Sequence, residues 1–432
     1  MTLVPRTFED AEPAVRLKIV ILNDSGTARG GATGLALRQA RLMRARGHDV
    51  TFISGDSQCD PDLTAHGVAT LSLGGALLLD DNRMRAMRNG LYNHAAARRL
   101  RAFIAMNDTP RTLYHLHGWS RILSPSVFDA LRPVARRSFL HAHDFFLACP
   151  NGVYFDYGRN KVCTRTPLSG ACMAARCDKR NMAQKGWRLL RQASLRRAFA
   201  PAAADGPDWA GVMMVHPAMA EGLTRAGIPA ELLREARNPA APYTDLRIRA
   251  EDNGTCCYIG QNIPGKGVAM LCEAARRAGV PLKVIGDPGA RPELVRAYPE
   301  VRFTGWVEPD NIGDHLQDVR ALVMPSRFTE PFGLVAAEAS LSGLPVIVSD
   351  TAMLAGEVES AGLGLRADAT DPDALARSLR RMVRMPAAQV RAISLRGYDR
   401  SAPLAQPEGA WIDAMLNHYR RTLLMQGAAV PA

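Results

Sequence analysis

The sequence predicts an α/β protein of two domains, each built on a doubly wound parallel β-sheet. The chain has 432 residues, which is too long for one compact core. Short apolar segments alternate with amphipathic segments through residues 16–240, and the alternation starts again after residue 254. Parallel strands need a long crossover between them, usually a helix, so this alternation favours parallel sheets over hairpins.

The first domain is expected over residues 15–240. RLKIVIL (16–22) predicts a buried strand, the glycine-rich ARGGATG (28–34) opens an amphipathic helix that closes on Gly47, and HDVTFIS (48–54) predicts a second strand. This order is a βαβ unit, which requires a parallel sheet. Further strands are expected at TLYHLHG (112–118), SFLHAHD (138–144) and GVMMVH (211–216).

The second domain is expected over residues 255–404, after a linker at 241–254 that is rich in Pro, Asp and Asn. Residues 1–14 are expected to be a disordered tail. The amphipathic segment at 405–426 is expected to form a helix that packs back on the first domain. The alternation after the linker predicts a second Rossmann-like domain, with strands at 255–260, 281–286, 301–305, 321–325 and 344–350 and helices at 267–279, 334–343 and 373–383.

Composition and hydropathy favour a globular cytoplasmic protein. Apolar residues make up 47% and charged residues 22% of the chain, both ordinary values for globular proteins. No window reaches the ~18 apolar residues of a membrane-spanning helix. The first dozen residues carry acids and match neither a signal peptide nor an anchor.

The net charge of +12 is concentrated in the first half. Residues 1–240 hold 33 Lys and Arg against 20 Asp and Glu, whereas residues 241–432 hold 21 against 22. A basic face attracts phosphates of nucleic acid, of an anionic membrane or of a pyrophosphate-linked substrate, and it also serves as an ordinary solvated face. The basic residues gather in an insert at 149–190 and in a cluster of Arg83, Arg85, Arg88, Arg98, Arg99 and Arg101.

The most specific segment is MPSRFTEPFGLVAAEASLSGLPVIVSD (324–350). Its pattern places Glu330 in a loop at the tip of a strand and Glu338 inside the following helix, among apolar and small residues. Burying an unpaired carboxylate is costly, so we expect a ligand or partner to hydrogen-bond Glu338. Free backbone N–H groups near Phe332, Gly333 and Leu334, at the helix start, suit an anion such as a diphosphate.

The E-P-F-G-x-x-x-x-E pattern, with its glutamates eight residues apart, resembles the retaining glycosyltransferases of family 4. Their architecture is GT-B, two Rossmann-like domains facing a cleft. The resemblance implies that Glu330 contacts donor-sugar hydroxyls near the reacting carbon and that Glu338 holds the nucleotide ribose. YIGQNIPGKG (258–267) is similar to the segment that clamps the donor diphosphate. Lys266 falls on the family's lysine, whereas Gln261 stands where the family has arginine.

The same resemblance implies further donor contacts. Arg327 is a candidate to replace the missing arginine charge, and Gly305-Trp306-Val307 is similar to the stretch that lines the base pocket. In the first domain Gly30 and Gly31 match a glycine turn near the diphosphate. His143 is similar to a catalytic histidine that reaches the donor sugar, and His117 is the competing candidate.

The chain has eight cysteines. Cys59, Cys256, Cys257 and Cys272 fall in patterns that suggest small core residues. The other four lie within 29 residues, and such clustering indicates a structural zinc site or a set of free thiols. The spacing lacks C-x2-C pairs, and both interpretations stay open. These four candidate ligands are Cys149, Cys163, Cys172 and Cys177.

The resemblance implies transfer of a sugar from a UDP- or GDP-sugar to a glycan or lipid-pyrophosphate-linked acceptor in cell-surface or exopolysaccharide synthesis. Neither a catalytic metal nor another cofactor is required, because Lys266 and the helix start meet the phosphates. We expect peripheral contact with the inner face of an anionic membrane and no nucleic-acid partner. Two alternatives remain: a nucleic-acid-binding or scaffold protein with a degenerate sugar site, and a nucleotide-sugar epimerase.

Overall fold

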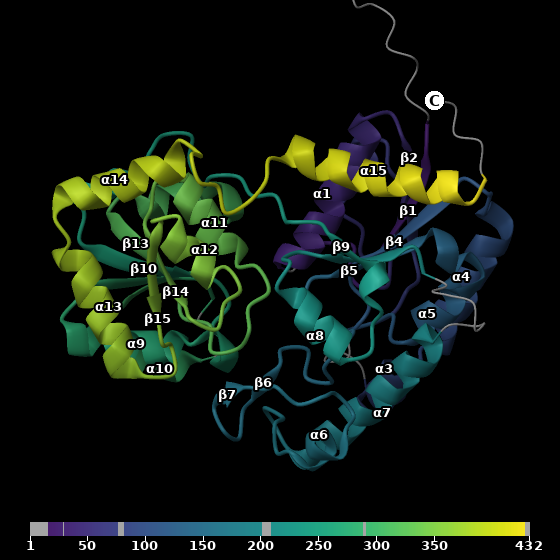
Figure 1. Ribbon diagram of the computed structural model, residues 1–432, viewed down its shortest axis with the longest axis horizontal. Helices are drawn as coiled ribbons and strands as arrows, with labels where there is room; N and C mark the ends of the chain where they lie inside the picture. The colour runs from purple at the N-terminus through teal and green to yellow at the C-terminus, as the bar shows by residue number, and fades with distance from the viewer. Residues whose placement is uncertain (1–15, 29, 77–81, 201–208, 288–290, 428–432) are drawn as a thin grey trace, which may run out of the picture. The chain divides into compact units, whose positions relative to one another are not determined.

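The structure is a computed structural model that describes residues 16–28, 30–76, 82–200, 209–287 and 291–427 (Figure 1). It confirms the predicted α/β class. A seven-stranded sheet has the order β3-β2-β1-β4-β5-β8-β9, and a six-stranded sheet has the order β12-β11-β10-β13-β14-β15. Their strand registers are parallel, as the helical crossovers require.

The first sheet is centred on β1 (Lys18–Asn23), which pairs with β2 (Asp49–Ser54) and β4 (Thr112–Leu116). Five of the six residues of β1 and all five of β4 are buried, as expected for a parallel sheet covered on both faces. The other strands are β3 (Ala69–Ser72), β5 (Ser138–Ala142), β8 (Gly211–Met214) and β9 (Leu233–Glu235). The helices along this part are α1 (Gly31–Ala45), α2 (Pro61–Ala65), α3 (Arg83–Leu91), α4 (His94–Asn107), α5 (Ser126–Leu131), α7 (Met182–Phe199) and α8 (Met219–Arg225).

The second sheet is centred on β10 (Thr255–Ile259) and β13 (Val319–Met324), with β14 (Val346–Ser349) beside β13. Val268 and Leu271 of α9 (Val268–Ala278) pack with Leu375 of α13 (Pro372–Arg384) in one apolar cluster with these strands. The remaining elements are β11 (Leu282–Ile285), β12 (Arg302–Gly305), β15 (Gly364–Ala367), α10 (Pro292–Ala297), α11 (Leu334–Leu341), α12 (Ala355–Ser360), α13 (Pro372–Arg384) and α14 (Ala387–Tyr398).

The chain divides into two compact units that do not follow the sequence in single blocks. One unit takes its described residues from Met1–Leu140, Ala198–Gly211 and Ile412–Ala432, and the other from His141–Arg197 and Val212–Trp411. Of the predicted domain segments, the tail at 1–14 lies outside the described residues. In the described part of the chain, no helix has both the length and the apolar character needed to cross a membrane.

A buried polar network joins the C-terminal helix α15 (Glu408–Met425) to the first unit. The Gln39 side-chain nitrogen donates to the Tyr419 hydroxyl at 2.8 Å, and that hydroxyl also contacts His115. His117 Nε2 lies 3.0 Å from the Gln39 side-chain oxygen. All four side chains are buried, and these hydrogen bonds offset the cost of burying their polar groups.

Candidate active site

Three loops meet at the carboxyl edge of the second sheet because β10, β13 and β14 are parallel neighbours. They comprise residues 260–267 after β10, 325–333 after β13 and 350–354 after β14. Ligands of open parallel sheets bind outside the carboxyl ends of the strands. The predicted residues Gln261, Lys266 and Glu330 lie in these loops.

The first two loops are in backbone contact, and glycine at position 267 allows this close approach. Gly267 has φ 76°, and a Cβ there would stand 2.0 Å from the carbonyl oxygen of Pro325. The Arg327 N–H donates to the Gly265 carbonyl at 3.0 Å. A side chain at position 267 would push the loops apart, so glycine is required both by its backbone angle and by the space available.

The third loop fixes the second. The Thr351 hydroxyl lies 3.1 Å from the carbonyl oxygens of both Ser326 and Phe328, and the Met353 N–H donates to the Glu330 carbonyl at 3.0 Å. The backbone on both sides of Glu330 is therefore held from outside its own loop.

Glu330 and Lys266 form the polar centre of the site. The Lys266 ammonium donates to Glu330 Oε2 at 2.7 Å, and the Ser326 hydroxyl donates to the same oxygen at 2.9 Å. The side chains of Lys266 and Glu330 are 29% and 15% exposed, so the pair is shielded yet reachable. Lys266 also lies 5.3 Å from the ring centroid of Phe328.

The helix α11 begins beside this pair. Its N-cap Gly333 has φ 85°, and a Cβ there would stand 2.7 Å from the Met324 sulfur. The Gly333 carbonyl accepts hydrogen bonds from the N–H groups of Ala336 and Ala337, which lie in the first turn of the helix. The preceding Phe332 is 3% exposed and Leu334 is partly buried. The N–H groups of a first helical turn have no partner within the helix, which makes this end suitable for an anion.

Glu338 has a protein partner that the sequence did not indicate. The Tyr243 hydroxyl donates to Glu338 Oε2 at 2.8 Å, and the Tyr243 N–H donates to Ser342 at 2.8 Å. Burial, and then the neighbouring Glu338 carboxylate, raise the pKa of Tyr243 well above its ordinary value. Tyr243 therefore remains a hydrogen-bond donor at any physiological pH and orients Glu338.

Three buried polar side-chain atoms in the first two loops lack hydrogen-bond partners within the described residues. Gln261 is exposed, whereas the adjacent Asn262 is 3% exposed. Within the described residues, neither polar atom of the Asn262 side chain has a hydrogen-bond partner, and the same holds for the Thr329 hydroxyl. An unsatisfied buried polar group costs about 1–3 kcal/mol. These groups therefore favour a ligand that supplies their partners.

Three other predicted donor contacts have different surroundings. Trp306 is 68% exposed at the end of β12, and its indole N–H donates to Glu308 at 3.1 Å. Val307 is partly buried. The Arg327 guanidinium donates to the Asn160 side chain. The roles of Trp306, Val307 and Arg327 toward a donor stay predictions.

The predicted residues of the first half occupy a strand end and a helix start. Gly30 is the exposed N-cap of α1, with φ 141°, and Gly31 is the first residue of that helix. His143 follows β5, and its ring stacks on His141 with centroids 4.2 Å apart. Burial lowers the pKa of His143 to about 3, so its imidazole is neutral at physiological pH. His117 is bound in the buried network with Gln39.

The cysteines separate into two groups. Cys256, Cys257 and Cys272 are buried, as expected for small core residues. Cys59 is exposed, so the core interpretation is wrong for this residue; it lies in a loop just before Asp60, which caps α2. The four candidate zinc ligands, Cys149, Cys163, Cys172 and Cys177, line one pocket.

Known proteins share parts of this sequence. Residues 253–385 match the family described as Glycosyl transferases group 1. The lipopolysaccharide 1,2-N-acetylglucosaminetransferase of Salmonella typhimurium is 28% identical over 151 residues, which are 31% of this chain and 39% of that protein. The D-inositol 3-phosphate glycosyltransferase of Streptomyces avermitilis is 31% identical over 200 residues, 42% of this chain and 41% of that protein. The chain thus spans about two fifths of the length of these relatives.

Solved structures share the whole fold. Sucrose-phosphate synthase from Thermosynechococcus elongatus superposes with a TM-score of 0.68 at 19% identity, over 95% of this chain and all of that one. HepE from Anabaena, solved with UDP and glucose, gives 0.64 at 16% identity, over 93% of this chain and 99% of that one. The fold is therefore GT-B, as predicted. The family match covers residues 253–385, and membership in family 4 stays a prediction.

Proposed function

We propose that this chain is a retaining glycosyltransferase that moves a sugar from a UDP- or GDP-sugar to a glycan or lipid-linked acceptor in bacterial polysaccharide synthesis. The observation that carries the proposal is the Lys266–Glu330 pair, 2.7 Å apart at the carboxyl edge of the sheet beside the start of α11. A cation and a helix start suit a diphosphate, and an adjacent carboxylate suits sugar hydroxyls. The family match at 253–385 covers all of these groups.

Each group has a role that follows from its contacts. Lys266 and the N–H groups at the start of α11 bind the diphosphate and stabilise the charge that develops as it leaves. Glu330, held by Ser326 and by backbone contacts on both sides, accepts hydrogen bonds from the donor sugar. Glu338, oriented by Tyr243, accepts hydrogen bonds from the nucleotide ribose. Asn262 and Thr329 offer the donors that the family's arginine would otherwise supply, because the buried polar atoms of both side chains have no partner within the described residues.

The chemistry requires positioning more than a protein nucleophile. The acceptor hydroxyl approaches the anomeric carbon from the face that the diphosphate leaves, so configuration is retained. The bond from that carbon to the phosphate oxygen breaks, the bond to the acceptor oxygen forms, and the departing phosphate takes the acceptor proton. The neutral imidazole of His143 accepts or donates one hydrogen bond at the donor sugar without adding charge.

Transfer assays with UDP- and GDP-sugars test this function. Glu330→Gln and Lys266→Ala should each cut transfer or donor hydrolysis about tenfold or more, which corresponds to losing a charged hydrogen bond of about 1.5–3 kcal/mol. Glu359→Gln is the matched control, because Glu359 is 63% exposed on another helix. Unchanged turnover in both site variants would remove the assignment, as would salt-sensitive binding of random DNA without any nucleotide binding.

The acceptor side of the proposal includes docking on an anionic membrane. Arg85 and Arg88 of α3 are exposed, and so are Met84 and Met87 of the same helix, at 77% and 47%. Cationic and apolar side chains on one helix suit the surface of an anionic bilayer. A lipid-pyrophosphate acceptor would be presented at such a surface.

Vesicle co-sedimentation tests the docking. The full chain should bind vesicles that contain anionic phospholipid and should not bind neutral phosphatidylcholine vesicles. Reversal of Arg83, Arg85 and Arg88 to Glu should abolish binding, because each basic residue contributes about 1 kcal/mol near an anionic surface. A control triple reversal uses exposed arginines elsewhere: Arg302, Arg381 and Arg384. Failure of the unaltered protein to bind anionic vesicles excludes the docking while leaving the transferase assignment intact.

A further inference from the structure

The segment from Cys149 to α7 has little regular structure of its own. Between these points it forms only two-residue strands, β6 (Phe155–Asp156) and β7 (Lys161–Val162), and the five-residue helix α6 (Gly170–Ala174). Ion pairs tie it together, with Arg165 2.8 Å from Asp156 and Arg188 3.1 Å from Asp178. Short segments with so little regular structure are commonly stabilised by a covalent or metal cross-link.

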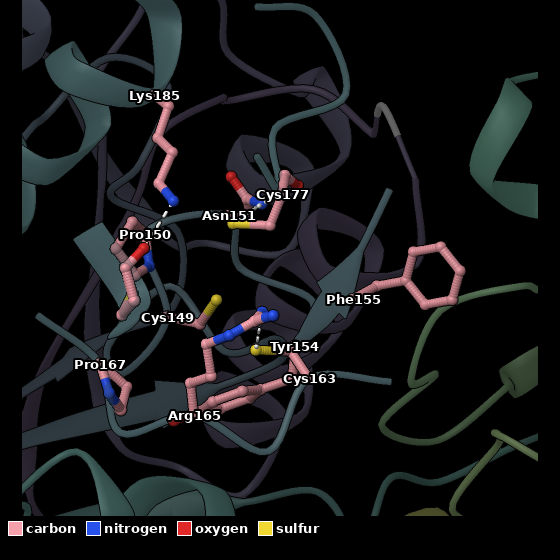
Figure 2. Close-up of a pocket in the computed structure, with 11 residues that line it drawn as sticks. Cys149, Pro150, Asn151, Tyr154, Phe155, Cys163, Arg165, Pro167, Cys177 and Lys185 are labelled. Atoms are coloured by element: carbon pink, nitrogen blue, oxygen red, sulfur yellow. Dashed lines mark hydrogen bonds between the residues drawn. The ribbon is translucent and has the colours of Figure 1, made fainter. Parts of the chain in front are cut away.

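Four cysteines from three parts of this segment line one small cavity, whose volume is about 20 Å³. The Cys149 N–H donates to the Phe145 carbonyl in a turn, and Cys163 follows β7. Cys172 lies within α6, and Cys177 follows that helix. A cavity of this size has room for one water molecule or ion. Figure 2 shows Cys149, Cys163 and Cys177 around this space, with the Arg165 guanidinium beside the Cys163 sulfur.

The cavity wall also carries a buried cation. Lys185 of α7 is 2% exposed, and its ammonium donates to the carbonyl oxygens of Cys172, at 2.5 Å, and of Ala175. No carboxylate pairs with Lys185 in the part of the chain that the structure describes. A buried charge without a counter-charge is costly. Lys185 and all four cysteines line the same cavity.

Two of the sulfurs already receive hydrogen bonds. The Asn151 amide nitrogen lies 3.5 Å from the Cys177 sulfur, and an Arg165 guanidinium nitrogen lies 3.5 Å from the Cys163 sulfur. Such donors stabilise thiolates more than neutral thiols, because hydrogen bonds to an ionised acceptor are the stronger ones. Donors of this kind around metal-bound thiolates hold the ligands in place.

We propose that Cys149, Cys163, Cys172 and Cys177 together bind one structural Zn²⁺. Four thiolates and one Zn²⁺ carry a net charge of −2, which supplies the counter-charge that buried Lys185 needs. Cys172 and Cys177 are separated by four residues, 173–176, within the spacing found for paired zinc ligands. Binding releases one proton from each thiol to solvent and involves no change of oxidation state.

The sulfurs must converge for this to happen. No three of them lie within 4.8 Å of one another, whereas four sulfurs at ~2.3 Å from one zinc ion are ~3.8 Å apart. Rotation of the cysteine side chains about the Cα–Cβ bond brings them inward, and the cavity leaves space for this movement. The metal therefore fixes the loops around α6. The site is structural because cysteine sulfurs fill all four coordination positions of the zinc ion.

Metal analysis of the purified full chain tests the site. The protein, produced in medium with zinc and purified without chelator, should hold about one zinc per chain after gel filtration. In the Cys59→Ser variant, which lacks the exposed thiol outside the cluster, titration with an organomercurial should release that zinc as four thiols react. Cys163→Ser and Cys177→Ser should each lose most of the zinc, whereas Cys59→Ser should keep it, because Cys59 is exposed outside the cluster.

A second variant keeps the four thiols and removes the positive charge of Lys185. Lys185→Met should weaken zinc affinity about 5- to 30-fold in competition with a chromogenic chelator. This measurement keeps the proposal testable if the serine variants do not fold. The proposal is overturned if the unaltered protein has less than about a tenth of a zinc per chain and takes up none from added zinc. Iron in place of zinc, or disulfides among the four cysteines by intact mass, would also overturn it.

Discussion

Replacing Glu330 with glutamine should tighten the binding of UDP while it slows sugar transfer. The Lys266 ammonium donates to Glu330 Oε2 at 2.7 Å, so the carboxylate competes with a diphosphate for the same cation. The glutamine side chain would keep the shape of the glutamate but remove its charge. The same substitution removes a charged hydrogen-bond acceptor for the donor sugar, which slows the reaction.

The magnitude follows from the burial of the pair. A hydrogen bond between charged groups contributes about 1.5–3 kcal/mol, and an exposed ion pair contributes about 0–1 kcal/mol. With side chains 29% and 15% exposed, the Lys266–Glu330 pair falls between these limits, at about 1–2 kcal/mol. Releasing Lys266 should therefore strengthen UDP binding about 5- to 30-fold.

Isothermal titration calorimetry of UDP at fixed ionic strength measures this change, with sugar transfer followed on the same preparations. The double variant Glu330→Gln/Lys266→Ala is the control and should bind UDP no more tightly than Lys266→Ala alone. Unchanged or weaker UDP binding by Glu330→Gln would refute the competition between Glu330 and the diphosphate.

Two further changes test the surroundings of the pair. Gly267→Ala should destabilise the fold by more than the ~1–2 kcal/mol cost of a left-handed backbone, because its Cβ would stand 2.0 Å from the Pro325 carbonyl oxygen. Gly279 is the control, because its φ is 64° and a Cβ there would meet open space. In chemical denaturation Gly279→Ala should show the backbone cost alone. Burial lowers the pKa of His143 from 6.5 to about 3, so from pH 6.5 down to 3 the unfolded chain binds a proton that the folded chain does not. The free energy of unfolding should fall over that window by at most about 1.4 kcal/mol per pH unit from this group, and His143→Gln should flatten the slope; identical slopes would contradict the burial of its neutral form.

The elements were predictable where local pattern determines them. The strand β13, the loop with Glu330 and the helix α11 could be placed from an apolar run, a Pro and Gly loop and a helical pattern ending at Gly343. Lys266 could be singled out because it follows β10 and precedes α9. Short elements such as β3, with three of four residues exposed and one partly buried, lack an apolar run and were not predicted.

The partners of the site residues could not be predicted because they come from distant positions. Tyr243 lies 95 residues from Glu338 in a segment expected to be a linker, and nothing in its local sequence indicates the contact. Thr351 reaches the loop of Ser326 only because β13 and β14 are adjacent in the sheet. The buried, unpartnered state of Asn262 depends on the packing around the loop, although its place beside Gln261 was a usable signal.

Hydrogen–deuterium exchange with a panel of UDP- and GDP-sugars tests whether Lys266, Glu330 and the start of α11 bind the donor. Saturable binding of at least one donor should slow exchange in residues 260–267 and 325–337, which hold Lys266, Glu330 and the start of α11. The Lys266→Ala variant should lose most of this protection at the same donor concentration. Protection confined to other parts of the chain, or none with any donor, would contradict the account.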